Sequence, residues 1–536
     1  MVPDVAAAET FTDDERRALA PYFTNLDAHV FALTNLPETV KGALFARYSR
    51  SAKSLRRLFL DEFAGKLDAA SPAGSAVGLE RAERLYAKVF SDYGDDSVAQ
   101  LGGAHLACEY VSNLLTKVLE RGRLMAYLEQ STRYVPYTDK RHGRWRYHVP
   151  AGLDASPLRQ RYLDTMDAAF ATYARLIEPM QAYFGHRYPK APTDSDAVHR
   201  SAIRAKALDT LRGLLPAATQ SNVGMYGTGQ AFEALLLRMR AHPLEEVRTC
   251  AAQMLTELRK VIPAFLTRVD QPDRGDRWSA YLAGIRDDTA DAAGRLLDGV
   301  EPQERPEVAL TDFDPDGEVK IVAAALYPSS DLPDDQLLAI ARRLSADERA
   351  GILRACIGTR GNRRHKPGRA FERTAYRFDV LTDYGAFRDL QRHRLLTIEW
   401  QTLTTRHGCV EPDAIRDAGV LDDWERVMHA SAALHDALVD AGAAAVAPYA
   451  VAMAYRVRFC LEMNAREAMH LIELRTAPQG HPSYRRVCQQ MHRLIADQAG
   501  HTAIAAAMTF ADHSDVELER LKAERDRERK NLEPRT

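Results

Sequence analysis

The sequence has no long apolar run that is free of charge. Its longest apolar stretch, residues 430–455, is mostly alanine and is interrupted by Asp436, Asp440 and Pro448. A membrane-spanning helix needs about 20 predominantly apolar residues without such charges. We therefore expect a packed pair of helices here and no membrane span. The acidic N-terminus also lacks the basic segment that precedes the apolar core of a secretory signal.

Cysteine is scarce, and neither sign of charge dominates. The six cysteines lie far apart and form no C-x-x-C pair. We therefore expect buried thiols in a reducing cytoplasm rather than a disulfide framework, and we predict no metal site. The formal net charge of −2 argues against general nucleic-acid binding, which usually depends on a basic surface. A local basic site for a small phosphorylated ligand is compatible with this balance.

Several familiar catalytic motifs are absent as well. The sequence contains no G-x-G-x-x-G after an expected strand, no G-x-x-x-x-G-K-[ST], no H-E-x-x-H and no nucleophile elbow. The usual dinucleotide loop, phosphate-binding loop, zinc peptidase site and serine hydrolase site are therefore not expected.

Helical periodicity dominates the chain. Apolar residues recur at three- and four-residue spacing in residues 54–67, 78–94, 232–265 and 422–442, which predicts helices there. Strand signals are few and short, in residues 144–150, 319–327 and 374–384. The fold class predicted from this pattern is α+β with much helix.

A chain of 536 residues is too long for one compact core. The stretch rich in Pro, Asp and Glu near residue 300 is the best candidate for a boundary. We predict a first domain at residues 1–300, a linker at 301–317, a second domain at 318–515 and a charged tail at 516–536. The tail is expected to be a solvated helix rather than a functional element.

A pattern recurs in the two halves. Residues 121–123 read Arg-Gly-Arg and are followed, eight residues after the second arginine, by Ser131; residues 392–394 read Arg-His-Arg and are followed at the same spacing by Thr402. Each pattern precedes an insert, a helix and a further apolar segment that ends in basic residues. This ordered set favours a duplicated domain.

The residues of these patterns suit anion binding. Paired guanidiniums offer forked donors to phosphate oxygens, and a nearby hydroxyl adds a short donor. Glu129, Ser131 and Arg133 alternate along the chain, so in an extended loop they would share one side. An acid beside two donors suits a nucleotide, although a surface loop with an ion pair is the alternative.

The second half adds a helical segment, residues 464–475, with the sequence NAREAMHLIELR. Asn464, His470 and Arg475 could line a cofactor groove along one side of this helix. The alternative is an ordinary amphipathic helix with a polar outer face.

These stretches resemble the signature motifs of the flavin-dependent thymidylate synthases, the ThyX family. Arg-His-Arg followed by seven residues and Ser is similar to the family's flavin motif, EQSTRY at 129–134 is similar to its substrate loop, and NAREAMHLIELR is similar to its late helix. Weaker similarities lie in FARYSRS at 45–51, RGLLP at 212–216 and FERTAYRF at 371–378. The resemblance implies two ThyX-like domains, each a helix-rich domain with a small sheet.

The resemblance also implies ligands and roles. FAD would meet Arg392, His393, Arg394, Asn464, Arg466 and His470. The substrate dUMP, or a related uracil nucleotide, would meet Arg121, Arg123, Glu129, Ser131, Arg133 and Arg212. Arg475 would hold the uracil and act as the catalytic residue. The implied reaction is reductive methylation of uracil C5 with methylenetetrahydrofolate and NADPH, without a protein nucleophile, so the cofactor would perform the chemistry.

Each half departs from the family pattern in a different place. The first half has Gly122 where the family has His, and no Asn-Ala-Arg; the second half has Leu403 and Thr404 where the substrate motif should end. This complementary loss predicts one composite site, with the substrate loop from half one and the flavin helix from half two. A cytoplasmic homodimer would then reproduce four domains. The alternatives are another reaction of a ThyX-like enzyme, or a degenerate nucleotide- or flavin-binding protein without synthase activity.

Overall fold

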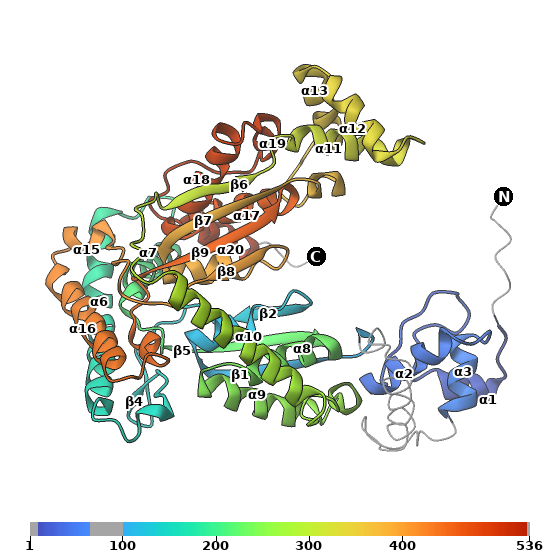
Figure 1. The fold of residues 1–536 in the computed structure, drawn as a ribbon, viewed down its shortest axis with the longest axis horizontal. Coiled ribbons are helices and arrows are strands. Elements are labelled where there is room, and N and C mark those ends of the chain that lie inside the picture. Colours follow the sequence, from blue (N-terminus) through green and yellow to red (C-terminus); the bar gives the residue numbers. More distant parts are fainter. Residues whose placement is uncertain (1–8, 65–99, 533–536) are drawn as a thin grey trace. The chain divides into compact units, whose positions relative to one another are not determined.

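The computed structural model describes residues 9–64 and 100–532 (Figure 1). The chain divides into two compact units: the first comprises residues 1–109, 124–129 and 222–300, and the second comprises residues 110–123, 130–221 and 301–536. The second unit therefore contains long segments of both sequence halves. The predicted domain boundaries stay a prediction, and the helix expected over residues 78–94 lies outside the described residues.

Two segments of the chain pass through the same order of elements. The first segment contains β1 (Gly103–Ser112), α5 (Asn113–Leu119), β2 (Met125–Glu129), β5 (Gln220–Thr228) and α8 (Gly229–Arg240). The second contains β7 (Ala375–Asp383), α14 (Tyr384–Gln391), β8 (Thr397–Trp400), β9 (Arg456–Asn464) and α17 (Ala465–Arg475). The strand orders match, β1-β5-β2 in one sheet and β7-β9-β8 in the other, where β6 (Val308–Phe313) is added beside β7. The α+β class and the duplication are both confirmed.

The same capping device starts the helices in both repeats. The last residue of each strand accepts a hydrogen bond from a backbone N–H of the next helix: Ser112 from Leu115, Thr228 from Ala231, Asp383 from Ala386 and Asn464 from Glu467. Such caps satisfy otherwise unpaired N–H groups and fix the point where a strand turns into a helix. Each cap therefore fixes the residue at which its helix begins.

The remaining elements are as follows. The first unit also contains α1 (Asp13–Leu19), α2 (Glu38–Tyr48), α3 (Leu55–Glu62), α9 (Glu245–Leu258), η5 (Pro263–Leu266) and α10 (Gly275–Leu296). The second unit also contains β3 (Lys140–Arg141), β4 (Arg144–Trp145), η3 (Ala151–Leu153), α6 (Arg159–Arg187), α7 (Asp196–Leu211), η4 (Arg212–Leu214), α11 (Gly317–Leu326), η6 (Tyr327–Ser329), α12 (Asp334–Arg343), α13 (Ala346–Ile357), η7 (Arg369–Glu372), α15 (Asp413–Asp417), α16 (Leu421–Asp440), η8 (Ala447–Ala450), α18 (Pro482–Asp497), α19 (Thr502–Ala507) and α20 (Leu521–Leu532). Among the described residues, we find no helix with both the length and the apolar character needed to cross a membrane.

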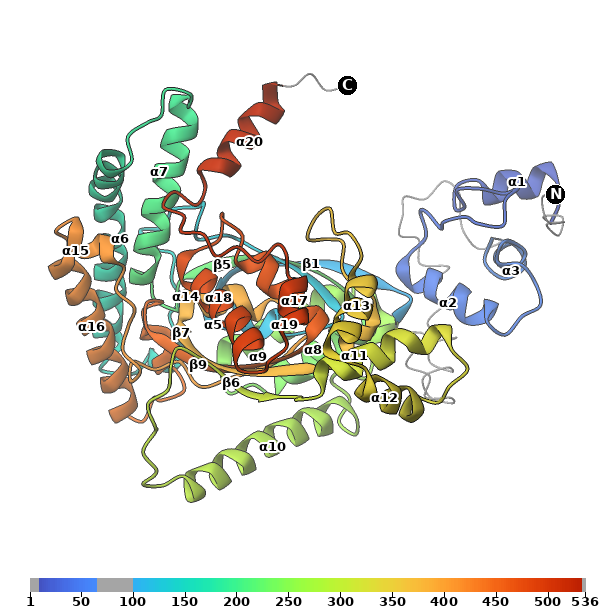
Figure 2. The ribbon, with the colours of Figure 1, turned by 90° about the horizontal axis from the view of Figure 1, so that it is seen from above.

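The core of the second unit lies under one face of its four-stranded sheet. Val457, Phe459, Leu461 and Met463 of β9 are all buried and alternate with less buried neighbours. Helices α17 and α18 pack on this sheet, and α6, α7 and α16 form a separate helical layer (Figure 2). The period of two is the pattern of a strand with one face in the core.

The two halves interlock inside the second unit. The backbone N–H of Ala217 donates to the carbonyl of Val451 at 2.8 Å, and the N–H of Met453 donates to the carbonyl of Leu215 at 2.9 Å. These bonds join the segments that precede β5 and β9, one from each repeat. They place η4 of the first half beside the second half, and Arg212 is its first residue.

The strand expected at residues 319–327 is wrong, because Gly317–Leu326 forms helix α11. Three consecutive alanines, residues 323–325, have a high intrinsic helix propensity that outweighs the short apolar run. The signal at 144–150 yields only the two-residue strand β4, whereas the signal at 374–384 is confirmed by β7. The predicted linker contains β6, which pairs with β7.

The charged tail forms a helix that makes specific contacts. Arg525 of α20 pairs with Asp194 at 2.5 Å, and Glu528 accepts a hydrogen bond from Ser195, the N-cap residue of α7. Before α20, Glu519 is 3% exposed and pairs with Lys206 of α7 at 2.5 Å. The tail is therefore anchored to α7 rather than fully solvated.

Candidate active site

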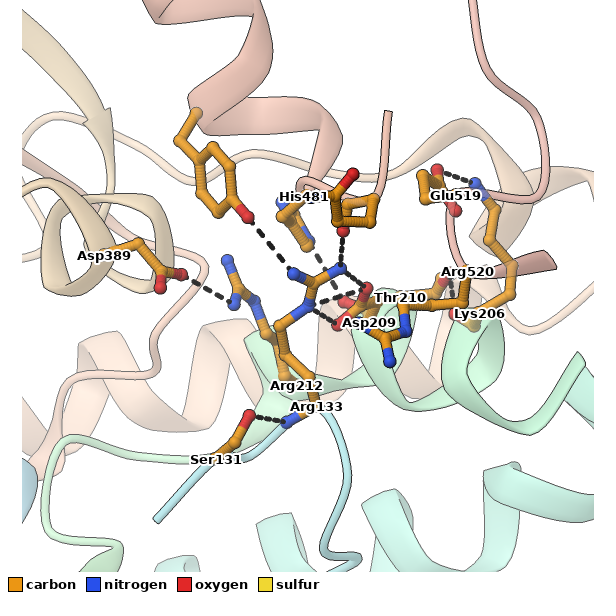
Figure 3. A network of polar contacts seen from close by, with 12 residues as sticks. Ser131, Arg133, Lys206, Asp209, Thr210, Arg212, Asp389, His481, Glu519 and Arg520 are labelled. Atoms are coloured by element: carbon orange, nitrogen blue, oxygen red, sulfur yellow. Dashed lines mark hydrogen bonds and ion pairs between the residues drawn. The ribbon is translucent and has the colours of Figure 1, made fainter. Parts of the chain in front are cut away.

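Arg133 of the first half is held by a forked ion pair. Its Nε and Nη2 atoms donate to the carboxylate of Asp209 on α7 at 2.7 and 2.6 Å, and its Nη1 atom donates to the Tyr484 hydroxyl at 3.1 Å (Figure 3). The Ser131 hydroxyl accepts from the backbone N–H of Arg133 at 3.2 Å. Burial opposes ionisation of Asp209, but the Arg133 guanidinium outweighs it and holds the pKa of this carboxyl below its usual range.

A second buried carboxylate, Asp389 on α14, gathers arginines from both halves. Arg392 Nη2 lies 2.5 Å from one oxygen, Arg212 Nη1 lies 3.5 Å from the other, and Arg475 Nη1 lies 3.6 Å from the first. Arg212 belongs to the first half, and the other two arginines belong to the second. Burial raises the pKa of Asp389, but the guanidiniums of Arg392, Arg475 and Arg212 lower it far more, so this group is ionised at neutral pH.

His393 links this cluster to α17. Its Nε2 atom accepts a hydrogen bond from Arg475 Nε at 2.9 Å, and its Nδ1 atom lies 3.2 Å from Glu467 Oε1. Burial, and then the nearby Arg475 charge, hold the pKa of His393 well below its usual value. Burial raises the pKa of Glu467 to about 7 despite the charges of Lys366, Arg466 and Arg394. The pair is therefore a hydrogen bond from a neutral imidazole rather than an ion pair.

The tautomer of His393 follows from its neighbours. Arg475 can only donate, so Nε2 of His393 must be the acceptor and Nδ1 carries the proton that is donated to Glu467. The ligand atoms of His393, Glu467 and His470 lie within 4.8 Å of one another, a grouping that could otherwise suit a metal ion. In this arrangement the lone pair that Nδ1 would need for a metal is absent, because that atom is protonated.

A cavity of about 310 Å³ opens beside this cluster. Arg123 of the first half lines it together with Thr397, Asn464, Arg466 and Glu467 of the second. Arg123 donates to Thr397 Oγ1 at 2.9 Å, and Arg466 donates to the carbonyl of Pro367 at 2.9 Å. Three residues with predicted ligand contacts thus share one cavity, although two were assigned to the cofactor and one to the substrate.

The other predicted residues are placed more separately. Arg121 pairs with Glu399 at 2.5 Å and lies over the Trp400 ring at 5.1 Å. Arg394 is exposed, and the His470 ring lies 5.5 Å from that of His393. Glu129 is 7% exposed at the end of β2, in the first unit. The roles of all these residues stay predictions.

Four residues of the network were not identified from the sequence: Asp209, Asp389, Glu467 and Tyr484. Asp389 and Glu467 had a usable signal, because each lies three residues from a predicted site residue, Arg392 and Asn464, on or next to a helix. Asp209 and Tyr484 had no such signal, since their contact with Arg133 spans 76 and 351 residues of sequence.

The fold and the site thus define a duplicated α+β protein whose repeats share one buried arginine–carboxylate cluster. A model of the family described as thymidylate synthase complementing protein, Thy1, matches residues 43–264 and 309–499. The chain belongs to this family. The two matched regions confirm the predicted tandem duplication of a ThyX-like domain.

Relatives match at two levels. A protein of Chlamydia muridarum named UPF0159 protein is 40% identical over 520 residues, covering 96% of this chain and 98% of that protein. The flavin-dependent thymidylate synthase of Mycobacterium avium is 32% identical over 181 residues, covering 33% of this chain and 66% of that enzyme. A solved structure, the UMP/dUMP methylase PolB of Streptomyces cacaoi bound with 5-Br dUMP, is 19% identical with a TM-score of 0.30, covering 39% of this chain and 97% of that one.

Replacing Asp389 by Asn should destabilise the protein by about 3 kcal/mol or more, because three guanidiniums would lose their shared buried counter-charge. Denaturant unfolding at pH 7 measures this. The matched control is Asp423→Asn, which removes a carboxylate that pairs with Arg175 and Arg426 near the surface and should cost about 1 kcal/mol or less. Equal losses in the two variants would contradict the central role of Asp389.

Glu467 should impose a pH dependence on stability. Its folded pKa of about 7 lies above the ordinary value of 4.5, so the folded protein binds the proton more tightly than the unfolded chain does. Stability should therefore fall as the pH rises from 4.5 to 7 and then level off, by on the order of 2–3 kcal/mol relative to Glu467→Gln. Unfolding curves of both proteins at several pH values give this difference. Parallel profiles would show that folding does not raise the pKa of Glu467.

Proposed function

We propose that this protein is a thymidylate synthase-like enzyme that reductively methylates uracil C5 of dUMP, or of a related uracil nucleotide. FAD is the cofactor, and methylenetetrahydrofolate and NADPH are the co-substrates. The observation that supports this proposal is the meeting of Arg212 from one repeat with Arg392 and Arg475 from the other at a single carboxylate. Relatives named flavin-dependent thymidylate synthase support the reaction class.

The first-half residues would bind the nucleotide phosphate. Arg133 and Arg212 are both largely buried, and the nearby Ser131 adds a hydroxyl. Forked guanidinium donors in a place of low water content bind phosphate strongly. Because Asp209 and Asp389 already occupy these donors, a dianionic phosphate would have to share or replace carboxylate contacts. That exchange favours a ligand with two charges over one with a single charge.

The cavity beside α17 fits part of a flavin dinucleotide. Two guanidiniums, Arg123 and Arg466, with the amide of Asn464 and the hydroxyl of Thr397, would supply donors for a diphosphate. Glu372, Glu462 and Glu467 also line the cavity, and Glu372 lies 3.6 Å from Arg466, so the diphosphate would have to compete with these carboxylates. The cavity's volume of about 310 Å³ lies within the roughly 300–1,000 Å³ of small-molecule sites. When bound, the flavin would supply the one-carbon transfer and the reducing electrons.

Arg475, positioned by His393, would act on the pyrimidine. Arg475 is oriented by two acceptors, His393 Nε2 and the Asp389 carboxylate. Its remaining N–H groups can hold a uracil carbonyl, and its positive charge would favour loss of the N3 proton. The fixed tautomer of His393 keeps Arg475 in this orientation.

The alternative is a nucleotide- or flavin-binding protein without synthase activity. One observation favours it: Arg133, Arg212, Arg392 and Arg475 are all already paired with carboxylates of the chain itself, Asp209 and Asp389. An enzyme must exchange these contacts in each catalytic cycle, whereas a degenerate site could keep them.

Activity is tested with the purified full-length protein. NADPH oxidation should depend on both dUMP and methylenetetrahydrofolate, and mass spectrometry should find a product heavier by one methyl group in place of one hydrogen. Bound flavin without this product would support the binding protein instead. Absence of both flavin and product would contradict the proposal.

Two variants should separate cofactor from substrate binding. Arg466→Ala should lose flavin absorbance and keep dUMP binding, because Arg466 lines the cavity. Arg133→Lys keeps a charge for Asp209 but loses the fork, so it should weaken dUMP binding about tenfold and keep flavin. The matched control for the first is Arg369→Ala, which removes another guanidinium near Glu372. Calorimetry measures dUMP binding, and absorbance measures bound flavin. If Arg466→Ala kept flavin and lost dUMP binding, while Arg133→Lys lost flavin and kept dUMP binding, the assignment would be refuted.

A further inference from the structure

A second basic cavity, larger than the one beside α17, shares Val410 and Arg486 with a pocket lined by Asp209 and Arg212. It has a volume of about 560 Å³ and lies in the second unit. Its walls are residues 302–305 and Glu307 before β6, His407 and Val410 of the loop before α15, Leu381 near the end of β7, the start of β9 and Arg486 of α18. Neither the family resemblance nor the proposed reaction uses these residues.

Positive charge dominates this cavity. Four arginines line it, Arg305, Arg456, Arg458 and Arg486, against two carboxylates, Glu304 and Glu307. The lining therefore carries a net charge of +2 with His407 neutral. Because the whole chain has a formal net charge of −2, this is a local concentration of positive charge and not a general property of the surface.

Two of the four guanidiniums are paired with carboxylates. Arg458 pairs with Asp379 at 2.8 Å, and Arg486 holds Glu307 through two contacts at 2.8 and 2.7 Å. These pairs fix the side chains in place. They also leave the other two arginines as the main source of uncompensated charge.

Within the described part of the chain, Arg305 and Arg456 have no carboxylate partner within 4.0 Å. Arg456 donates to the carbonyl of His407 at 3.2 Å, and Arg305 contacts the side chain of Gln303 and the carbonyl of Glu304. Both arginines therefore have guanidinium donors to spare toward an anion in the cavity.

The cavity is built on a rigid frame. Arg456 and Arg458 alternate along β9, so they project from the same face, and Leu381 pairs with Arg458 in the sheet. Glu307 accepts hydrogen bonds from Thr382 and Gln490 in addition to Arg486. The segment before β6 is thus tied to β7 and α18. Burial first, and then Arg458, Arg406 and Arg456, lower the pKa of His407, as expected in a basic enclosure.

We propose that this cavity binds a small molecule through a diphosphate group. Two unpaired guanidiniums and two positioned ones match the several charges and acceptor oxygens of a diphosphate. The apolar part of the lining consists of Pro302, Leu381 and Val410, with no Phe, Tyr or Trp. Recognition therefore rests on the diphosphate rather than on stacking of a base.

Calorimetric titration of the full-length protein with sodium pyrophosphate at low ionic strength tests the proposal. Binding should be measurable, and Arg456→Ala and Arg305→Ala should each weaken it about tenfold or more. A parallel titration with ADP shows whether a nucleoside attached to the diphosphate binds as well as free pyrophosphate does. Thermal unfolding checks that Arg456→Ala is folded. Arg305 is exposed in a segment outside helices and strands, so Arg305→Ala should fold and still tests the proposal if Arg456→Ala does not.

The matched control is Arg406→Ala. Arg406 lies in the loop that contains His407 and Val410 but does not line the cavity, so this variant removes one positive charge next to the cavity and none from its walls. It should leave pyrophosphate binding nearly unchanged. Absence of binding, or equal weakening by Arg406→Ala, would overturn the proposal. Binding that survives the two cavity variants but is lost in Arg133→Lys or Arg466→Ala would place the ligand in the candidate active site and would also overturn it.

Discussion

The site depends on the ion pairs between the ionised Asp389 carboxylate and the arginines around it. Asp389 is 8% exposed and faces guanidiniums from both repeats. A buried charge costs several kcal/mol unless it is paired, so the guanidiniums of Arg212, Arg392 and Arg475 together stabilise the ionised Asp389 in this structure. Within the second unit, the cluster therefore joins residues of the two repeats by electrostatics, in addition to the backbone bonds between the segments that precede β5 and β9.

Duplication explains why both repeats have the same order of elements around this cluster, and divergence explains why their side chains there differ. Both repeats place a short capped helix after a strand, and both end that helix at an arginine pattern. In the second repeat His393 links Arg475 to Glu467, whereas the first repeat has Gly122 at the matching position and has no side chain to make such a link. One repeat has the imidazole, and the other has Ser131 and Arg133, which the proposed function assigns to the substrate. The proposed composite site would draw on both.

The sequence was sufficient for the class of the fold and the duplication, and it also singled out the three arginines that the structure gathers at Asp389, Arg212, Arg392 and Arg475. Local patterns carried these predictions: the period of the helices, the strand ending in Asp383 and the repeated arginine motif. The carboxylates were harder to predict. Asp209 contacts Arg133 across 76 residues, and only the packing of α7 brings the two together. The strand predicted at residues 319–327 is wrong, because a short apolar run does not distinguish a strand from a helix. The high helix propensity of the alanines in this run favours the helix.

The central claim is that one ligand site is formed by residues of both repeats. A crystal structure of the full-length protein with bound dUMP tests it most directly. The account predicts that the phosphate of one nucleotide contacts Arg133 or Arg212 of the first repeat, while its uracil contacts Arg475 of the second. A nucleotide bound by residues of one repeat alone, with Arg212 and Arg475 still closed around Asp389, would contradict it.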